Sequence, residues 1–315
     1  MRNLAAGLVG LVTLLAAKSA WAAFHIMQIT EVFPGTNAQP NAQYIELQMY
    51  AAGQNIVGGH TVTVFDAAGT QVMTYTFAAN VASGTNQSTI LIATAQAATL
   101  FGVVPDLTMT PTIPLAGGKV CFETIDCVAW GNYTGGATPS PVGQPAYQAR
   151  GMILGRSLTR KLGANSMLDG ADDTGVSATD FERALPTPRN NAGTAPTIPT
   201  STCGNNAIEG LESCDDNNMT ANDGCSAMCV TESCGDGIVQ APETCDDTNT
   251  NNTDACSNAC GVQAPMVDGP PPSVDGPPMM PGDDGGGCCQ TGGAGATPLL
   301  ALLVLGLLAR RRRVR

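Results

Sequence analysis

The residues best placed to do chemistry in this chain are eight cysteines that form two copies of one spacing. Each copy reads C-x10-C-x10-C-x3-C, and every cysteine of the first copy recurs 31 residues later. Thiols at such fixed spacing either cross-link as disulfides or bind a metal such as zinc. The two sets are Cys203, Cys214, Cys225 and Cys229, and then Cys234, Cys245, Cys256 and Cys260.

The surrounding residues favour disulfides over zinc. Each copy has about 30 residues with few apolar side chains among them, so it cannot build a core large enough to fold it. A disulfide that closes a loop of about 15 residues contributes about 3 kcal/mol to stability. Structural zinc sites use close cysteine pairs on both sides, whereas each copy has one close pair. Four cysteines allow three pairings, and the spacing does not choose among them.

Acidic residues between these cysteines offer oxygen ligands of the kind that Ca²⁺ prefers. The segments CDDNNMTANDGC and CDDTNTNNTDAC do not follow the spacing of an EF-hand. Aspartate and asparagine also form turns through side-chain to backbone bonds, and we expect that role, with no cofactor bound. Calcium remains the alternative, and its candidate ligands are Asp215, Asp216, Asp223, Asp246, Asp247 and Asp254.

The first copy, CGNNAIEGLESCDDNNMTANDGCSAMC, resembles the Myxococcus cysteine-rich repeat. The second copy departs from that pattern at Thr248 and at Ala255, which stands where the pattern has glycine. The resemblance implies a secreted bacterial protein in which the repeats act as an extracellular spacer or interaction module. It implies no catalytic role.

The first residues read as a secretory signal peptide. Arg2 supplies the basic start, an apolar run extends from Leu4 to Ala17, and Ala20-Trp21-Ala22 fits the small-x-small cleavage rule. We expect cleavage after Ala22, because the apolar run is short for an uncleaved anchor. The mature chain would then lie outside the cytoplasm, where disulfides persist.

Near the C-terminus, Cys288 and Cys289 precede a short apolar run, Leu299–Ala309, and five arginines at positions 310–313 and 315. These features resemble MYXO-CTERM, the myxobacterial sorting tail. With the preceding small residues this run reaches about 18 residues, the lower limit for a membrane-spanning helix. The resemblance implies recognition by a sorting protease in the membrane, cleavage near the two cysteines and display at the cell surface. A lipid on the cysteine is an open alternative.

Residues 24–130 carry the signature of an all-β domain. Apolar residues alternate with polar ones in QYIELQM, TVTVF and QVMTYTF, and glycine-containing turns separate these short segments. TAQAATLFG suggests a brief helix. VCFETIDCVAWG suggests a hairpin in which Cys121 and Cys127 face each other and form a disulfide.

This domain contains the segments IMQITEVFP, QYIEL, NIVGGHTV and the hairpin ending DCVAWG, followed by SLTR…DF…PTPRNN within 155–191. Through these segments it resembles the lamin-tail domain over residues 26–191. The resemblance implies an immunoglobulin-like β-sandwich that binds or tethers.

No recognised catalytic motif appears in the chain. His25 and His60 lie outside any metalloprotease motif, and we expect DGADD at 169–173 to be a solvated loop. We expect Arg156, Arg160 and Lys161 to be surface charges on a strand edge that deter sheet stacking. An enzyme within the β domain is the more distant alternative.

The sequence therefore predicts a mainly β protein without enzymatic activity. It would be anchored at the bacterial outer surface and would present an immunoglobulin-like sandwich on a disulfide-rich stalk. After processing, 7 basic and 26 acidic residues remain, so we expect no nucleic-acid partner. The ligand would be an extracellular protein or polysaccharide, and calcium-dependent adhesion is the alternative. The predicted segments are 1–22 signal peptide, 23–192 sandwich, 193–202 linker, 203–229 and 234–260 repeats, 261–287 disordered linker, and 288–315 sorting tail with a short transmembrane helix.

Overall fold

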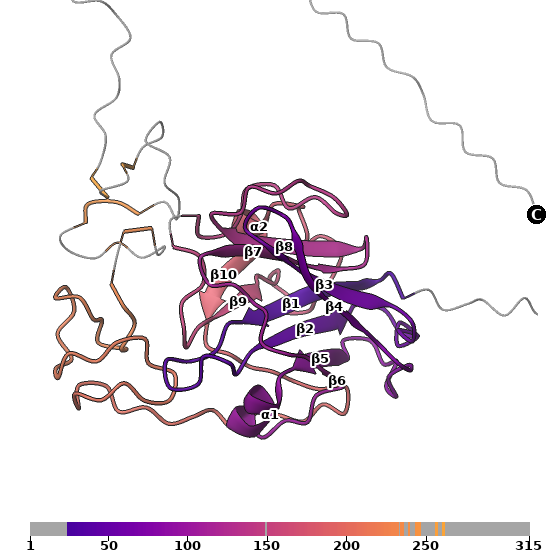
Figure 1. Cartoon of the computed structure of the whole chain (residues 1–315), viewed down its shortest axis with the longest axis horizontal. Coiled ribbons are helices and arrows are strands. Elements are labelled where there is room, and N and C mark those ends of the chain that lie inside the picture. Colours follow the sequence, from indigo (N-terminus) through magenta and orange to yellow (C-terminus); the bar gives the residue numbers. More distant parts are fainter. Residues whose placement is uncertain are drawn as a thin grey trace, which may run out of the picture. The chain divides into compact units, whose positions relative to one another are not determined.

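The structure is a computed structural model of the whole chain (Figure 1). The residues it describes are 24–148, 150–232, 234–235, 239, 243–246, 256–257 and 260–261. The chain divides into two units, Met1–Met266 and Val267–Arg315, and all described residues lie in the first. Ala22, Cys288, Cys289, Asp247 and Asp254 lie outside the described residues, as do the predicted signal peptide, disordered linker and sorting tail.

Short strands dominate the first part of the described chain. In order, the elements are β1 (Met27–Phe33), β2 (Tyr44–Met49), β3 (Thr61–Asp66), β4 (Gln71–Thr76), β5 (Thr89–Ala93), α1 (Ala95–Phe101), β6 (Leu107–Thr108), β7 (Gly117–Phe122), β8 (Asp126–Gly131), β9 (Ser157–Arg160), α2 (Ser177–Asp180) and β10 (Phe181–Ala184). The brief predicted helix is α1. Thr94 caps its first turn by accepting from Ala97 N, and Gly102 ends it in the left-handed region at φ 66°.

The strands form two sheets, and we call this part of the chain the two-sheet domain. One sheet has the order β10-β9-β1-β2-β5-β6 and the other β4-β3-β7-β8. Figure 1 shows them as two layers, with α1 beside β5 and β6. The prediction of a mainly β two-sheet domain followed by a disulfide-rich region is confirmed.

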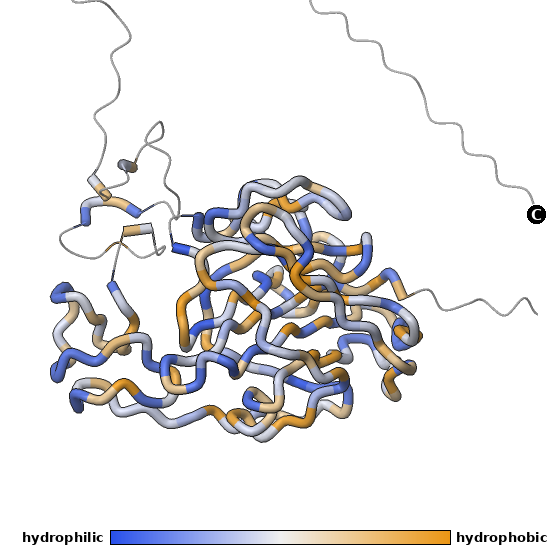
Figure 2. Tube along the Cα trace, viewed as in Figure 1, coloured by the Kyte–Doolittle hydropathy of each residue, from blue (hydrophilic) through white to orange (hydrophobic). Residues whose placement is uncertain are grey.

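The main core lies between the two sheets. Ile45 and Leu47 of β2 and Trp130 of β8 are fully buried there, and the Trp130 indole donates to Pro114 O at 2.8 Å. The predicted alternation of β2 therefore places its apolar residues correctly. Apolar segments run through these strands, and hydrophilic segments alternate with apolar ones in the cysteine-rich turns that follow (Figure 2).

A second apolar cluster covers the outer face of the six-stranded sheet. Phe33, Tyr44 and Leu91 pack there against Phe101 of α1 and against Leu211 from the first cysteine-rich copy. β2 is consequently buried on both faces, although its alternating pattern is typical of a strand with one solvated face. The polar residues of that pattern lie under chain segments that are distant in sequence.

The free side of β10, the last strand of the larger sheet, is protected by its own chain. The backbone N–H of Phe181 donates to Ser177 O, and that of Arg183 donates to the Tyr147 hydroxyl at 2.9 Å. The expectation that Arg160 is an exposed edge charge is wrong, because its side chain is 0% exposed. Pairing of another strand with this edge is therefore prevented by the hydrogen bonds that its N–H groups already make, and not by surface charges.

The ten cysteines before the tail form five disulfides. Cys121 bonds to Cys127 across the β7–β8 hairpin, as the sequence predicts. In each cysteine-rich copy the first cysteine bonds to the fourth and the second to the third. These bonds are Cys203–Cys229, Cys214–Cys225, Cys234–Cys260 and Cys245–Cys256. We call residues 203–229 repeat 1 and residues 234–260 repeat 2.

Candidate functional site

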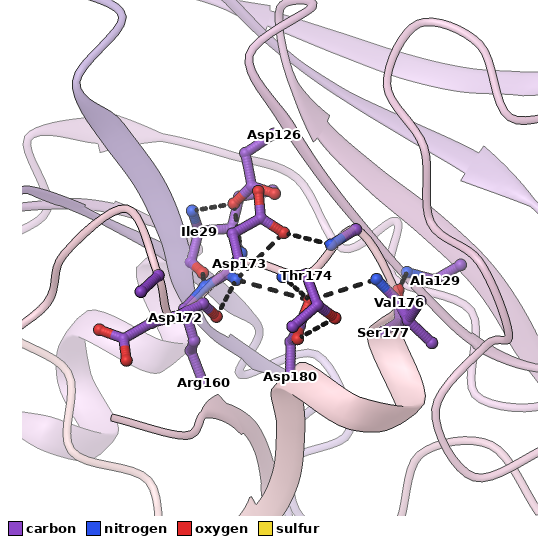
Figure 3. A network of polar contacts seen from close by, with 12 residues as sticks. Ile29, Asp126, Ala129, Arg160, Asp172, Asp173, Thr174, Val176, Ser177 and Asp180 are labelled. Carbon is purple, nitrogen blue, oxygen red and sulfur yellow. Dashed lines mark hydrogen bonds and ion pairs between the residues drawn. The ribbon is translucent and has the colours of Figure 1, made fainter. Parts of the chain in front are cut away.

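Arg160 at the end of β9 is the centre of a buried polar network (Figure 3). Its Nη2 lies 2.6 Å from Asp126 Oδ2, and its Nη1 lies 3.6 Å from Asp173 and 4.0 Å from Asp180. Its Nε donates to Ile29 O at 2.9 Å. The network thus joins β9 to β1, to β8 and to the loop that the sequence predicted to be solvated.

The Arg160 guanidinium is bonded to Asp126 and to the backbone carbonyls of Ile29 and Asp172, so the network ties distant segments of the fold together. Burial raises the pKa of Asp126 from 3.8 to about 6, and the Arg160 charge opposes that shift. Asp180 accepts from Thr174 Oγ1 at 2.6 Å and from Thr174 N at 3.0 Å, so its carboxylate orders the loop before α2. We therefore assign the cluster a structural role.

Two buried glutamates face each other on the outer surface of the larger sheet. Glu31 of β1 and Glu46 of β2 are direct cross-strand partners and are 2% and 6% exposed. Burial and, for Glu46, the neighbouring Glu31 charge raise the pKa of both carboxyls above their usual range. Sequence reasoning misses this pair, because the alternation in β2 predicts that its polar residues face water.

Residues 185–191, which we call the strap, cross over this pair. Glu31 accepts from Thr187 N at 3.0 Å, and Glu46 accepts from Arg189 N at 2.6 Å. Asn191 fixes the far end by donating to Ser83 O and Thr89 O, each at 3.0 Å. Raised pKa values in a polar pocket of about 500 Å³ are typical of acid–base groups, yet both carboxyls are engaged with strap amides. We interpret the pair as the attachment of the strap.

Repeat 1 is docked on the two-sheet domain. Leu211 is 4% exposed and completes the outer apolar cluster. Arg156 donates from Nη1 to Leu211 O at 2.9 Å and from Nη2 to Met228 O at 3.4 Å. Asn37 Nδ2 donates to Glu212 O at 3.1 Å from the other side. Gly155, at φ 84°, lies so close to Leu211 O that any Cβ would clash with it.

This docking forms a hollow that we call the junction groove. Its volume is about 700 Å³, within the range of known ligand sites. The chain before repeat 1 and repeat 1 itself both contribute to its apolar wall. Leu185, Ile198 and Pro199 precede repeat 1, Met228 lies within it, and Val230 directly follows it. Arg156 and Arg183 also line it.

The cysteine-rich region matches a known family. The family is described as Domain of unknown function (DUF4215), and it matches residues 200–230 and 227–261. No curated protein and no solved structure matches the chain. The DUF4215 match includes the repeat 1 side of the junction groove and leaves the two-sheet domain unassigned.

The calcium candidates in the DUF4215 region act mainly on the backbone where they are described. Asp215 accepts from the N–H groups of Gly204, Asn205, Asn206 and Asn217 at 2.9–3.1 Å. Desolvation opposes the effect, but these four bonds hold the pKa of Asp215 below its usual value. Asp246 accepts in the same way from Gly235 N at 2.7 Å. Asp216 and Asp223 interact with each other, and Asp223 also accepts from Asn218 Nδ2 at 3.0 Å.

Two further groups of potential ligand atoms occur beside the outer disulfides. Glu212 and Asp215 approach Cys229, and Glu243 lies near Cys234 and Cys260. Each of these sulfurs is already in a disulfide, so it offers no thiolate to a metal. Since the Asp215 oxygens are also used by amides, the residues do not form a credible metal centre. No helix in the described part of the chain has the length and apolar content needed to cross a bilayer.

Proposed function

We propose that this protein is a non-enzymatic surface protein of a bacterium, in which the two-sheet domain binds or tethers an extracellular partner. The observation that carries the proposal is the docking of repeat 1 through Leu211 and Arg156. It makes the binding domain and the start of the disulfide-rich region one body. Such a body suits presentation of a domain away from a surface.

The resemblances of the sequence extend this proposal. The two-sheet domain would be an immunoglobulin-like sandwich of the lamin-tail kind, a class that binds or tethers. The signal peptide ending at Ala22 and the tail from Cys288 onward would carry the chain out of the cell and fix it there. The strongest contrary feature is the Glu31–Glu46 pair, whose raised pKa values are common in enzymes.

Mass spectrometry of the mature protein, purified from its native cells, tests the processing. We expect a start at Ala23, a new end near Cys288, and oxidised cysteines at residues 203–260. Fractionation should place this form at the cell surface. Recovery of the intact chain from the cytoplasm, with reduced cysteines, would contradict the proposal.

Tail variants test the anchoring separately. Ser replacements of Cys288 and Cys289 should leave a full-length chain in the inner membrane, because the cleavage signal is lost. Deletion of residues 310–315 should instead release uncut chain into the medium, because the arginines no longer stop transfer. Gln290→Ser is the matched control and should be processed normally. Normal display of the double Ser variant would show that the cysteines are not the sorting signal.

A further inference from the structure

The junction groove exists only where repeat 1 is docked. Leu185, Ile198 and Met228 form its apolar rim and are 54%, 41% and 73% exposed. Three large apolar side chains gathered around one hollow are a feature of binding surfaces and not of ordinary solvated surface. Methionine adapts its shape to varied apolar partners, so Met228 suits a recognition role.

A ligand of this groove must be recognised through side chains. Although β10 is an edge strand beside the groove, the N–H groups of Phe181 and Arg183 are already bonded to Ser177 O and the Tyr147 hydroxyl. A peptide added as an extra strand needs such donors free. Strand addition to β10 is therefore excluded, and the apolar rim must supply the affinity.

The lining also disfavours a polysaccharide. Sugars need many hydrogen-bonding groups and usually an exposed aromatic face, whereas this rim is aliphatic. Tyr147 lines the groove, but the Arg183 guanidinium carbon lies 3.8 Å from its ring centroid and covers one face. Of the two ligand classes expected from the sequence, the groove fits a protein segment better.

Arg156 adds a charge requirement. In the described part of the chain its guanidinium bonds to the carbonyls of Gly155, Leu211 and Met228, and no carboxylate lies within ion-pair distance of it. A guanidinium has five N–H donors, so donors remain for a ligand. A partly buried cation without a carboxylate is costly, and an incoming carboxylate would bond to it with charge assistance. Glu182 and Glu212 also line the groove, and their negative charges disfavour a ligand with several acidic groups.

We propose that the junction groove binds an extended peptide segment of a partner protein, with an aliphatic or methionine side chain on the rim and a neighbouring carboxylate on Arg156. This proposal names the partner class for the extracellular binding role proposed above, and rests on it. The site is composite, because the two-sheet domain and repeat 1 each supply part of the wall.

Selection of phage-displayed random dodecapeptides on the purified, oxidised full chain tests the proposal. We expect enriched peptides that place Asp or Glu next to Leu, Ile, Val or Met. Met228→Asp should abolish their binding, since it places a carboxylate in the apolar rim. Arg156→Gln should weaken the binding of acidic peptides about tenfold or more, and should weaken the binding of their Asp→Asn versions clearly less. Because Arg156 also docks repeat 1, it is this difference between the two peptide sets that measures the carboxylate contact. Val104→Asp is the matched control, because Val104 is 74% exposed and lies outside the groove lining.

Three results would overturn the proposal. These are enrichment of no peptide, equal binding of the enriched peptides to the Met228→Asp variant, or binding of a polysaccharide that Met228→Asp blocks. Because Met228 is exposed, that variant should keep the melting temperature of the parent, so lost binding is separable from lost folding. Failure here would leave the surface localisation intact, whereas failure of the proposed function would appear in fractionation.

Discussion

The guanidinium of Arg156 donates to the backbone carbonyl of Leu211 at 2.9 Å, and this bond joins two parts of the chain that are stabilised mainly in different ways. The two-sheet domain relies on apolar burial between and outside its sheets. Repeat 1 relies on Cys203–Cys229 and Cys214–Cys225. Their contact makes the stability of each depend on the other.

Leu211→Ala should destabilise the two-sheet domain as well as repeat 1. The side chain fills the outer cluster beside Phe33 and Tyr44, and removing a buried leucine costs about 2–5 kcal/mol. Urea denaturation followed by tryptophan fluorescence measures the loss, since Trp130 is fully buried in the core of the two-sheet domain. Ile208→Ala, in the same repeat but exposed, is the control. Equal effects of the two changes would mean that Leu211 does not join the parts.

Arg160→Leu should destabilise the fold far more than Lys161→Leu. Arg160 is buried against Asp126, so its loss leaves a buried carboxylate without its cation, at a cost of about 3–5 kcal/mol. The neighbouring Lys161 is exposed, and its change should cost within about 0.5 kcal/mol. Thermal denaturation of both variants provides the comparison. A small effect for both would return Arg160 to the surface role expected from the sequence.

Glu46→Gln should stabilise the protein at alkaline pH and lose that advantage on acidification. Burial raises the pKa of Glu31, Glu46 and Asp126. Each of these carboxyls therefore holds more of its proton in the folded state than in the unfolded state, over a pH window that begins at its usual pKa and ends at its raised one. The usual pKa is 4.5 for the glutamates and 3.8 for Asp126, and the raised pKa of Asp126 is about 6. Stability from these groups is present below that window and is lost as the pH rises through it, by about 1.4 kcal/mol per pH unit for each proton.

Melting temperatures of parent and variant, compared from acidic to alkaline pH, measure the effect of Glu46→Gln. Glu182→Gln, at an exposed position of β10, should change little at any pH. A difference between parent and Glu46→Gln that does not vary with pH would show that Glu46 does not titrate with a raised pKa.

Millimolar Ca²⁺ should change the melting temperature little. A site filled at about 100 times its dissociation constant would add about 2.7 kcal/mol, a large rise for a domain of this size. The Asp215 oxygens accept four amide bonds, which leaves little capacity for a cation. A large rise that a chelator reverses and Asp223→Asn removes would favour calcium-dependent adhesion instead.

The parts of the fold that the sequence predicted are those fixed by local patterns. The hairpin joining Cys121 to Cys127, the helix capped by Thr94 and the core side of β2 all follow from spacing or period. The same reasoning failed for the burial of Arg160 and Glu46. Both side chains lie under segments that are distant along the chain, and a local hydrophobic period carries no information about such segments. The role of Leu211 was hidden for the same reason, since a lone leucine in a polar repeat looks exposed.

The order of disulfide bonds in the two repeats also determines how the chain bears a pull along its length. An open stretch of 26 residues can extend by about 3.3–3.6 Å per residue. The outer bond of each repeat instead holds its ends at Cα–Cα distances of 5.6 and 5.5 Å, so tension passes through that bond and bypasses the loop. Each repeat is therefore a nearly inextensible link, and lengthening under load is confined to the residues between and beyond the repeats.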